Sequence, residues 1–291
     1  MTQNLSIRPS PIAGQWYPGS ARRLAESVDE YIQSARLPEL PGKVVAVIAP
    51  HAGHVYSGAV AGYAFAAVRG LTPELVVIIS PMHQGYPQPL LTSAHIAYTT
   101  PLGDVPVDIE ALDALDAALR PLLGYGLRRV QNDREHSLEI ELPFLQRALA
   151  GPFNLLPVMV RDPSPGTMQA LAMALVQVLA QRGGSNLLVA SSDLSHFYPQ
   201  MTAKVLDQEM LRRIASFDPL AVLRAEDEGQ GFACGRGPIA AVLWAAQALG
   251  ADQVQILKHA TSGDVSGEFS QVVGYGAGVV LQTRKEIGDA V

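Results

Sequence analysis

Three histidines each follow an apolar run that predicts a buried β-strand. Imidazole binds transition metals and transfers protons near neutral pH, so these residues could form a metal site or an acid–base site. In an open α/β sheet, the loops at the carboxyl ends of parallel strands line the crevice where ligands bind. One such histidine would be an ordinary loop residue, but three together predict a single site built from three loops. The runs and their histidines are 44–48 with His51, 75–80 with His83 and 186–192 with His196.

The single cysteine, Cys234, lies in a glycine-rich turn at residues 231–238, just before a predicted helix. Pro238 suits the first turn of that helix. The helix N-terminus and the nearby Arg236 would favour the thiolate, which is the form of cysteine that binds metal or attacks carbon. The alternative interpretation is a small apolar residue in a tight turn.

His51, His83 and Cys234 together would give a metal ion three protein ligands and leave at least one position open. Catalytic metal sites have that arrangement, whereas structural zinc is normally closed by four ligands. Two imidazoles and one thiolate suit iron(II), zinc or copper, and the ligand types do not choose among these metals. The two histidines lack the short spacing of a zinc finger or a metalloprotease helix, so only the fold can bring the ligands together.

Proton transfer has three further candidates. Asp193 lies three positions before His196, so its carboxylate could orient the imidazole or tune its pKa. Alternatively, Asp193 caps the next helix and His196 only packs. His136 could reach the site as a second acid or hydrogen-bond donor, or it could be a half-buried structural residue. Tyr56 and Tyr275 either contact a substrate or fill the core.

The elements that must position these residues alternate between strands and helices, which predicts an α/β fold. We expect a central, largely parallel or mixed β-sheet flanked by helices, with antiparallel strands at 253–260 and 271–280 near its end. A further strand is expected at 154–160. Residues 135–149 predict a helix that is interrupted at Pro143. Other expected helices cover 20–35, 59–69, 107–119, 167–181, 203–214, 219–225 and 238–249.

No repeat, low-complexity segment or long linker divides the chain of 291 residues, so we predict a single domain over 1–291. Its core is expected at about residues 8–282, with terminal arms at 1–7 and 283–291. A hydrophobic content of 48% is ample for a large core. The formal charge of −6, with no basic cluster, argues against a nucleic-acid partner, because phosphate contacts need a concentrated Lys/Arg face.

Residues 44–68 contain no Asp, Glu, Lys or Arg and reach the length of a membrane span. Pro50 and Gly53, with polar histidines beside them, interrupt this stretch, so we predict no membrane partner. Residues 1–10 lack the apolar region of a signal peptide. A single cysteine excludes an internal disulfide and fits a reducing compartment, so we expect a cytoplasmic protein.

Several motifs, in this order along residues 8–281, resemble those of the Memo family. That order makes the resemblance specific for family membership. The motifs are Ala-Gly-Gln-Trp-Tyr at 13–17, Pro-His-Ala-Gly-His-Val-Tyr-Ser-Gly at 50–58, Ser-Pro-Met-His at 80–83, Glu-His-Ser-Leu-Glu at 135–139, Ser-Ser-Asp-Leu-Ser-His at 191–196 and Cys-Gly-Arg-Gly-Pro-Ile at 234–239.

The Memo family is similar in fold to class III extradiol dioxygenases, which hold a non-haem iron(II) with two histidines and a carboxylate. The resemblance implies His51, His83 and Cys234 as ligands of a metal, with iron(II) first and copper or zinc as alternatives. It also implies His196 as the acid–base residue and His136 as a second active-site histidine. Cys234 stands where the dioxygenases have glutamate. A thiolate donates more electron density and is oxidisable, which shifts the preference toward copper or zinc.

These implications lead to two functional hypotheses from different classes. The first is a dioxygenase-like oxidoreductase that acts on a hydroxylated aromatic or similar bidentate small molecule. The second is a non-catalytic binding or adaptor protein, or a metal carrier, that holds a peptide or a metal in the same pocket. Hydrolysis by zinc-bound water, with the same ligands, is a third hypothesis. The resemblance also implies an AMMECR-type protein and a radical SAM enzyme as partners.

Overall fold

A computed structural model describes residues 6–284 of the chain. Within these residues, nine strands form one mixed sheet in the order β10-β12-β2-β9-β3-β8-β4-β7, with β11 paired to β12. The four central strands are parallel to one another and almost entirely apolar and buried, as expected for strands covered on both faces. Their bounds are β2 Lys43–Ala49, β9 Asn186–Ser191, β3 Leu75–Pro81 and β8 Asn154–Val160.

Antiparallel pairs extend this parallel core on both sides. The strand β12 pairs antiparallel with β2, β10 and β11, and β4 pairs antiparallel with β8 and parallel with β7. A small second sheet has the order β1-β5-β6. The bounds are β10 Asp193–Tyr198, β11 Gln253–Thr261, β12 Val272–Gln282, β4 Leu90–Ser93, β7 Arg128–Val130, β1 Ile7–Arg8, β5 Ala97–Thr100 and β6 Gly103–Pro106.

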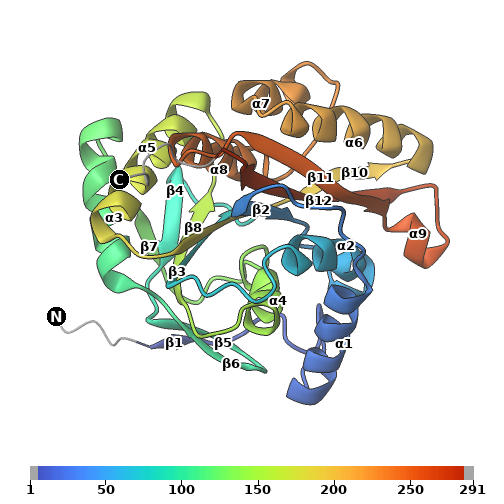
Figure 1. Cartoon of the computed structure of the whole chain (residues 1–291), viewed down its shortest axis with the longest axis horizontal. Helices are drawn as coiled ribbons and strands as arrows, with labels where there is room; N and C mark the ends of the chain where they lie inside the picture. The colour runs from blue at the N-terminus through green and yellow to red at the C-terminus, as the bar shows by residue number, and fades with distance from the viewer. Residues whose placement is uncertain (1–5, 285–291) are drawn as a thin grey trace.

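Helices cover both faces of the large sheet, as Figure 1 shows. One layer contains α1, α2 and α4, and the opposite layer contains α3, α5 and α8 with α6 and α7 beside them. The bounds are α1 Ala21–Ser34, α2 His54–Ala66, α3 Ile109–Leu123, α4 Leu142–Ala148, α5 Pro165–Arg182, α6 Gln200–Ala215, α7 Pro219–Asp227, α8 Arg236–Ala248 and α9 Gly263–Ser266. The predicted single-domain α/β fold with a helix-flanked mixed sheet is therefore confirmed.

The sheet order explains how distant histidines meet. The strands β2, β9 and β3 are direct neighbours, and all three run in the same direction. Their register pairs Ala49 with Ser191, so β2 and β9 end at the same level. The residues that follow these strands, His51 after β2 and His83 after β3, therefore lie at the same edge of the sheet. His196 lies in β10, which follows β9 directly, and not in a loop as expected.

The expected helix at 135–149 is wrong in its first third. A 3-10 turn covers Glu139–Glu141, and α4 begins only at Leu142, with Pro143 in its first turn. Proline fits a first turn because its missing N–H has no helical partner there in any case. Before the turn, the backbone N–H groups of His136 and Ser137 both donate to the side chain of Glu135, which competes with helix formation.

The alternative in which Asp193 caps a helix is also wrong, because Asp193 begins β10 and pairs with Tyr275 of β12. Of the expected terminal arms, residues 1–5 and 285–291 lie outside the described residues. Ile7 pairs with Ala97 in the small sheet, and the backbone N–H of Thr283 donates to Asp252.

The N-terminal strand is fixed by a buried ion-pair network. Arg8 is only 1% exposed, and its guanidinium lies 2.8 Å from a carboxylate oxygen of Asp133 and 2.5 Å from one of Glu139. Tyr17 donates to the other oxygen of Glu139 at 2.7 Å. Buried charges need such pairing to offset their desolvation. This network ties the start of the chain to the segment that carries His136.

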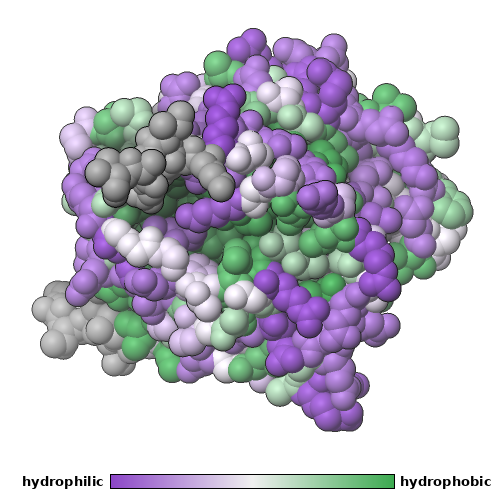
Figure 2. All heavy atoms as spheres, viewed as in Figure 1, coloured by the Kyte–Doolittle hydropathy of each residue, from purple (hydrophilic) through white to green (hydrophobic). Residues whose placement is uncertain are grey.

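The surface mixes polar and apolar residues. Figure 2 shows hydrophobic residues gathered in the middle of one face, with polar and charged residues around them. No helix within residues 6–284 has both the length and the apolar character that a membrane crossing needs.

Candidate metal centre

Three histidines form a compact group at the sheet edge. One ring nitrogen each from His51, His83 and His136 lies within 4.8 Å of the other two. The ring centroids of His83 and His136 are 4.8 Å apart and nearly parallel, and the His51 ring stands edge-on to both. His51 is buried, His136 is half-buried and His83 is exposed. The group is therefore open to solvent on the His83 side.

Cys234 joins this group through His51. Its Sγ lies 3.2 Å from His51 Nε2, although the group in which all ligand atoms are close contains His136 in its place. The turn before α8 is held by the backbone N–H of Gly235, which donates to Ser192 Oγ at 2.9 Å. The structure thus groups His51 and His83 with His136, and Cys234 contacts the His51 member of this group.

The expected thiolate at Cys234 is not favoured by its surroundings. Burial raises the pKa of the thiol far above its ordinary value, and the charge of Asp193 raises it further. Arg236 does not offset this, because its guanidinium pairs with Glu226. A buried thiol of this kind loses its proton when it binds a metal ion, because the ligand is the thiolate.

His83 is backed by an ionised carboxylate. Its Nδ1 lies 2.9 Å from Glu135 Oε1, and its backbone N–H donates to Glu135 Oε2 at 2.6 Å. The N–H groups of His136 and Ser137 also donate to Oε1, each at 3.0 Å. Burial alone would raise the pKa of Glu135, but the hydrogen bond from His83 and the charges of both histidines outweigh it and hold that pKa far below its usual range.

His51 is backed differently, by a hydroxyl. Its Nδ1 lies 2.8 Å from Ser191 Oγ, and Ser191 Oγ lies 2.7 Å from Oε1 of the buried Glu141. The backbone N–H of His51 donates to Asp193 Oδ1 at 2.8 Å. Burial lowers the pKa of His51 well below its usual value, and the neighbouring His136 and His83 lower it further. The imidazole is therefore neutral, which is the form that coordinates metals.

His196 has the orientation of a general base. Its Nδ1 donates to the carbonyl oxygen of Leu194 at 2.8 Å, so Nε2 keeps its lone pair. Burial lowers its pKa, which keeps the ring neutral near pH 7. Within the described residues, Asp193 makes no hydrogen bond to His196. Burial raises the pKa of Asp193 to about 7, partly offset by hydrogen bonds from the backbone of His51.

A groove of about 520 Å³ lies next to the histidine group, although neither these histidines nor Cys234 line it. Trp16 connects the two, because it lines the groove while its ring centroid lies 4.1 Å from that of His136. Phe197, beside His196, lines the groove with a φ of 64° and a 68% exposed side chain. A bulky residue at positive φ is a strained outlier, and the register of β10 shifts between His196 and Tyr198, the two residues that flank it. The aromatic residues of the groove are Trp16, Tyr56, Phe197 and Tyr275.

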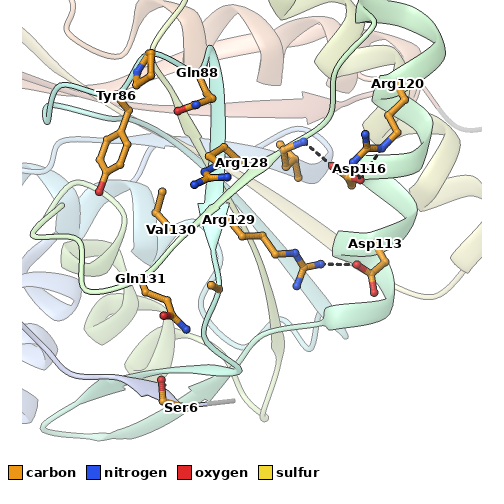
Figure 3. Close-up of a pocket in the computed structure, with 13 residues that line it drawn as sticks. Ser6, Tyr86, Gln88, Asp113, Asp116, Arg120, Arg128, Arg129, Val130 and Gln131 are labelled. Atoms are coloured by element: carbon orange, nitrogen blue, oxygen red, sulfur yellow. Dashed lines mark hydrogen bonds and ion pairs between the residues drawn. The ribbon is translucent and has the colours of Figure 1, made fainter. Parts of the chain in front are cut away.

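A larger cavity of about 1110 Å³ lies elsewhere, between β7 and α3. Figure 3 shows that two of its arginines already face acidic partners, with Arg129 on Asp113 and Arg120 on Asp116. None of the predicted site residues lines it. Its charges are largely satisfied within the protein, so we do not assign the chemistry to this cavity.

The groups that support the site were not predicted from the sequence. Glu135, Glu141 and Ser191 were given no role, although all three hold the imidazoles in place. One signal was present, since residues 135–141 carry three glutamates among apolar residues. Charged residues in an apolar stretch indicate buried carboxyl groups, which need partners.

Comparison with known proteins gives a consistent answer. A family model described as Memo-like protein matches residues 8–279. A MEMO1 family protein of Thermotoga neapolitana is 37% identical over 279 residues, which cover 92% of this chain and 98% of the relative. One of Nitrosopumilus maritimus is 35% identical over 275 residues, covering 93% and 98%. One of Methanopyrus kandleri is 34% identical over 278 residues, covering 93% and 97%. The chain belongs to the Memo-like protein family.

Proposed function

We propose that this protein is a metal-dependent oxidoreductase of dioxygenase type, with iron(II) held by His51, His83 and Cys234. The observation that carries the proposal is that each of the two imidazoles has a hydrogen-bond partner on its Nδ1. Each Nδ1 is hydrogen bonded to Ser191 or to Glu135, which keeps each Nε2 for coordination, and the Cys234 thiol lies 3.2 Å from that of His51. Metal-binding histidines almost always have such a partner on the second nitrogen.

The donor set fits a transition metal with open positions. Two imidazoles and a thiolate, with a third imidazole from His136 nearby, suit iron(II), and also copper or zinc. Bound iron(II) would supply Lewis acidity and one-electron chemistry toward O₂. The protein contributes a neutral imidazole at His51, a second imidazole at His83, a thiol that can ionise on binding, and an opening to solvent beside His83.

His196 would carry the proton transfers. We assign it to take a proton from a substrate hydroxyl at Nε2 and to return a proton later in the reaction, since its tautomer and lowered pKa both leave that nitrogen as a base. A hydroxylated aromatic or similar bidentate substrate suits the adjoining groove because four aromatic side chains are part of its lining. Trp16 and Phe197 would position that substrate against the centre.

Metal analysis of protein purified without oxygen tests the site, and oxygen uptake with a panel of catechol-like substrates tests the activity. We expect near-stoichiometric iron that is lost in His83→Ala and in Cys234→Ala. In His196→Ala we expect the iron to remain and oxygen uptake to stop. His95→Gln is the matched control, because it changes a buried histidine outside the group. Bound iron without uptake on any substrate would contradict the oxidoreductase, and zinc in place of iron would favour hydrolysis.

A binding or metal-carrier function is the second candidate. It is favoured by the exposed apolar rim of the groove, where the exposed fractions are 64% for Val55, 44% for Tyr56 and 68% for Phe197. Exposed apolar clusters often mark interaction sites. Partners in this hypothesis are a peptide, an AMMECR-type protein or a radical SAM enzyme, all in the cytoplasm. Binding of either purified protein at micromolar concentration, weakened by Phe197→Ala, would support it, and no binding would count against it.

A further inference from the structure

Glu141 is a buried acid that the proposed reaction does not use. Its side chain has no exposure, and Oε1 lies 2.7 Å from Ser191 Oγ. Its other oxygen, Oε2, is buried without a hydrogen-bond partner among the described residues. An ionised carboxylate with a bare buried oxygen is very costly, whereas the carbonyl oxygen of a neutral acid costs much less.

The hydrogen bonds around Ser191 Oγ allow the protons to be counted. Three groups surround this oxygen, namely the carbonyl oxygen of Ser137 at 2.6 Å, Glu141 Oε1 at 2.7 Å and His51 Nδ1 at 2.8 Å. A hydroxyl donates one hydrogen and accepts two. The carbonyl of Ser137 can only accept, so it takes the hydrogen of Ser191. The other two contacts then require donors, which must be His51 Nδ1–H and a protonated Glu141.

The other assignments leave close contacts without a proton. If Glu141 were ionised, the single hydrogen of Ser191 would have two acceptors at 2.7 Å or less, so one contact would oppose two lone pairs. If the proton of His51 were on Nε2, Nδ1 would be a third acceptor. Glu135 shows the contrast, because four N–H groups point at its two oxygens and satisfy a full negative charge.

We propose that Glu141 is a neutral carboxylic acid at neutral pH and that, through Ser191, it fixes the proton of His51 on Nδ1. Burial raises the pKa of Glu141 well above its ordinary value; the hydrogen bond with Ser191 offsets this only in part, and the charge of Asp193 adds to it. Glu141 is thus a positioning residue that acts on His51 from a distance. Its protonation stands without the proposed function, and only its consequence for a metal at Nε2 rests on that function.

Infrared difference spectroscopy tests the protonation directly. At pH 7, wild type minus Glu141→Gln should show the loss of one C=O stretching band of a protonated carboxyl group. Any band from Asp193 is present in both proteins and cancels. Loss of a carboxylate band in its place would overturn the proposal. If Glu141→Gln does not fold, Ser191→Ala decides, because it keeps Glu141 but removes its partner, so the same band should shift. An unchanged band would refute the link.

Cobalt(II) titration, followed by its visible absorption, tests the consequence at His51. Glutamine keeps a donor toward Ser191, so Glu141→Gln should bind Co²⁺ as tightly as wild type. Ser191→Ala removes the partner of the imidazole and should weaken binding about 10- to 100-fold. An equal loss in Glu141→Gln would show that a carboxylate is needed and would overturn the proposal. Absence of Co²⁺ binding in wild type would refute the proposed metal site, and the infrared result would still decide the charge of Glu141.

Discussion

The two histidines that follow β2 and β3 are supported by glutamates in opposite situations. Glu135, behind the exposed His83, receives four N–H groups and is held in its ionised form. Glu141, behind the buried His51, reaches the imidazole only through a serine hydroxyl. Both glutamates come from the seven-residue segment 135–141. The number of donors aimed at each carboxyl group, rather than its residue type or depth, decides which charge it carries.

This difference divides the candidate centre into two halves. A carboxylate behind an imidazole raises its basicity and makes it a stronger metal ligand. On the His83 side, the imidazole is therefore the stronger metal ligand and is open to solvent. On the His51 side, the imidazole is buried and neutral. In the proposed function, His83 is the ligand that is open to solvent, and His51 is the buried one.

The largest expected effect is on the ionised side. Glu135→Gln should lower the free energy of unfolding by about 3 kcal/mol at pH 7, because buried N–H groups lose a charged acceptor. The folded-state pKa of Glu135 is lowered, so its contribution is present above the ordinary glutamate range and is lost as the pH falls toward the folded-state pKa. Urea unfolding across pH would measure this. A difference from wild type that does not shrink in acid would contradict the ionised assignment.

Glu141→Gln should change the pH dependence of the free energy of unfolding in the opposite direction. The folded protein keeps the proton of Glu141 while the unfolded chain releases it, so wild-type stability falls as the pH rises above the ordinary glutamate range. Glutamine does not titrate. The free energy of unfolding of the variant should therefore rise relative to that of wild type by about 1.4 kcal/mol per pH unit in that range. The same unfolding measurements apply, and a stability difference that stays constant with pH would show that folding does not hold Glu141 in its protonated form.

A smaller effect is expected at the mouth of the groove. Phe197→Gly should raise the free energy of unfolding by about 1 kcal/mol, since glycine adopts a positive φ without strain. It should also weaken binding of aromatic ligands. Phe197→Ala is the matched control, because it removes the ring but keeps the strain. Equal stability of the two variants would show that the backbone at this position stores no strain.

The smallest expected effect is a difference in the rates at which a reagent modifies the two histidines. The side chain of His83 is 38% exposed and His51 is 1% exposed, so diethyl pyrocarbonate should modify His83 first. Added Zn²⁺ should protect His83 if the two share a metal. Peptide mass spectrometry would follow both sites. Modification of His51 at an equal rate would show that the buried half opens as readily as the exposed one.

The sequence was informative where one local pattern determined the structure. The apolar run at 154–160 predicted β8 to the residue, and the terminal strands at 253–260 and 271–280 proved antiparallel as expected. Convergence of the histidine loops followed from strand direction alone. The roles of His51, His83 and Cys234 as metal ligands remain predictions.

What could not be predicted depends on contacts between distant parts of the chain. The 135–149 segment had a helical period, but the side chain of Glu135 takes the N–H groups that a helix would use. Its partner His83 is 52 positions away, and Ser191 is 50 positions from Glu141. The pKa of Cys234 depends on burial, which its neighbours in sequence do not reveal. Local sequence therefore located the candidate residues but not their charge states.

The long separations within the centre have a consequence for the kinetics of folding. His51 and Cys234 are 183 positions apart, and Arg8 and Glu139 are 131 positions apart. Contacts of such high order close large loops at an entropic cost, so we expect them to form after the transition state for folding. Interactions absent from the transition state change the unfolding rate and leave the folding rate almost untouched. A ligand bound at this centre would therefore extend the lifetime of the folded protein without hastening its formation.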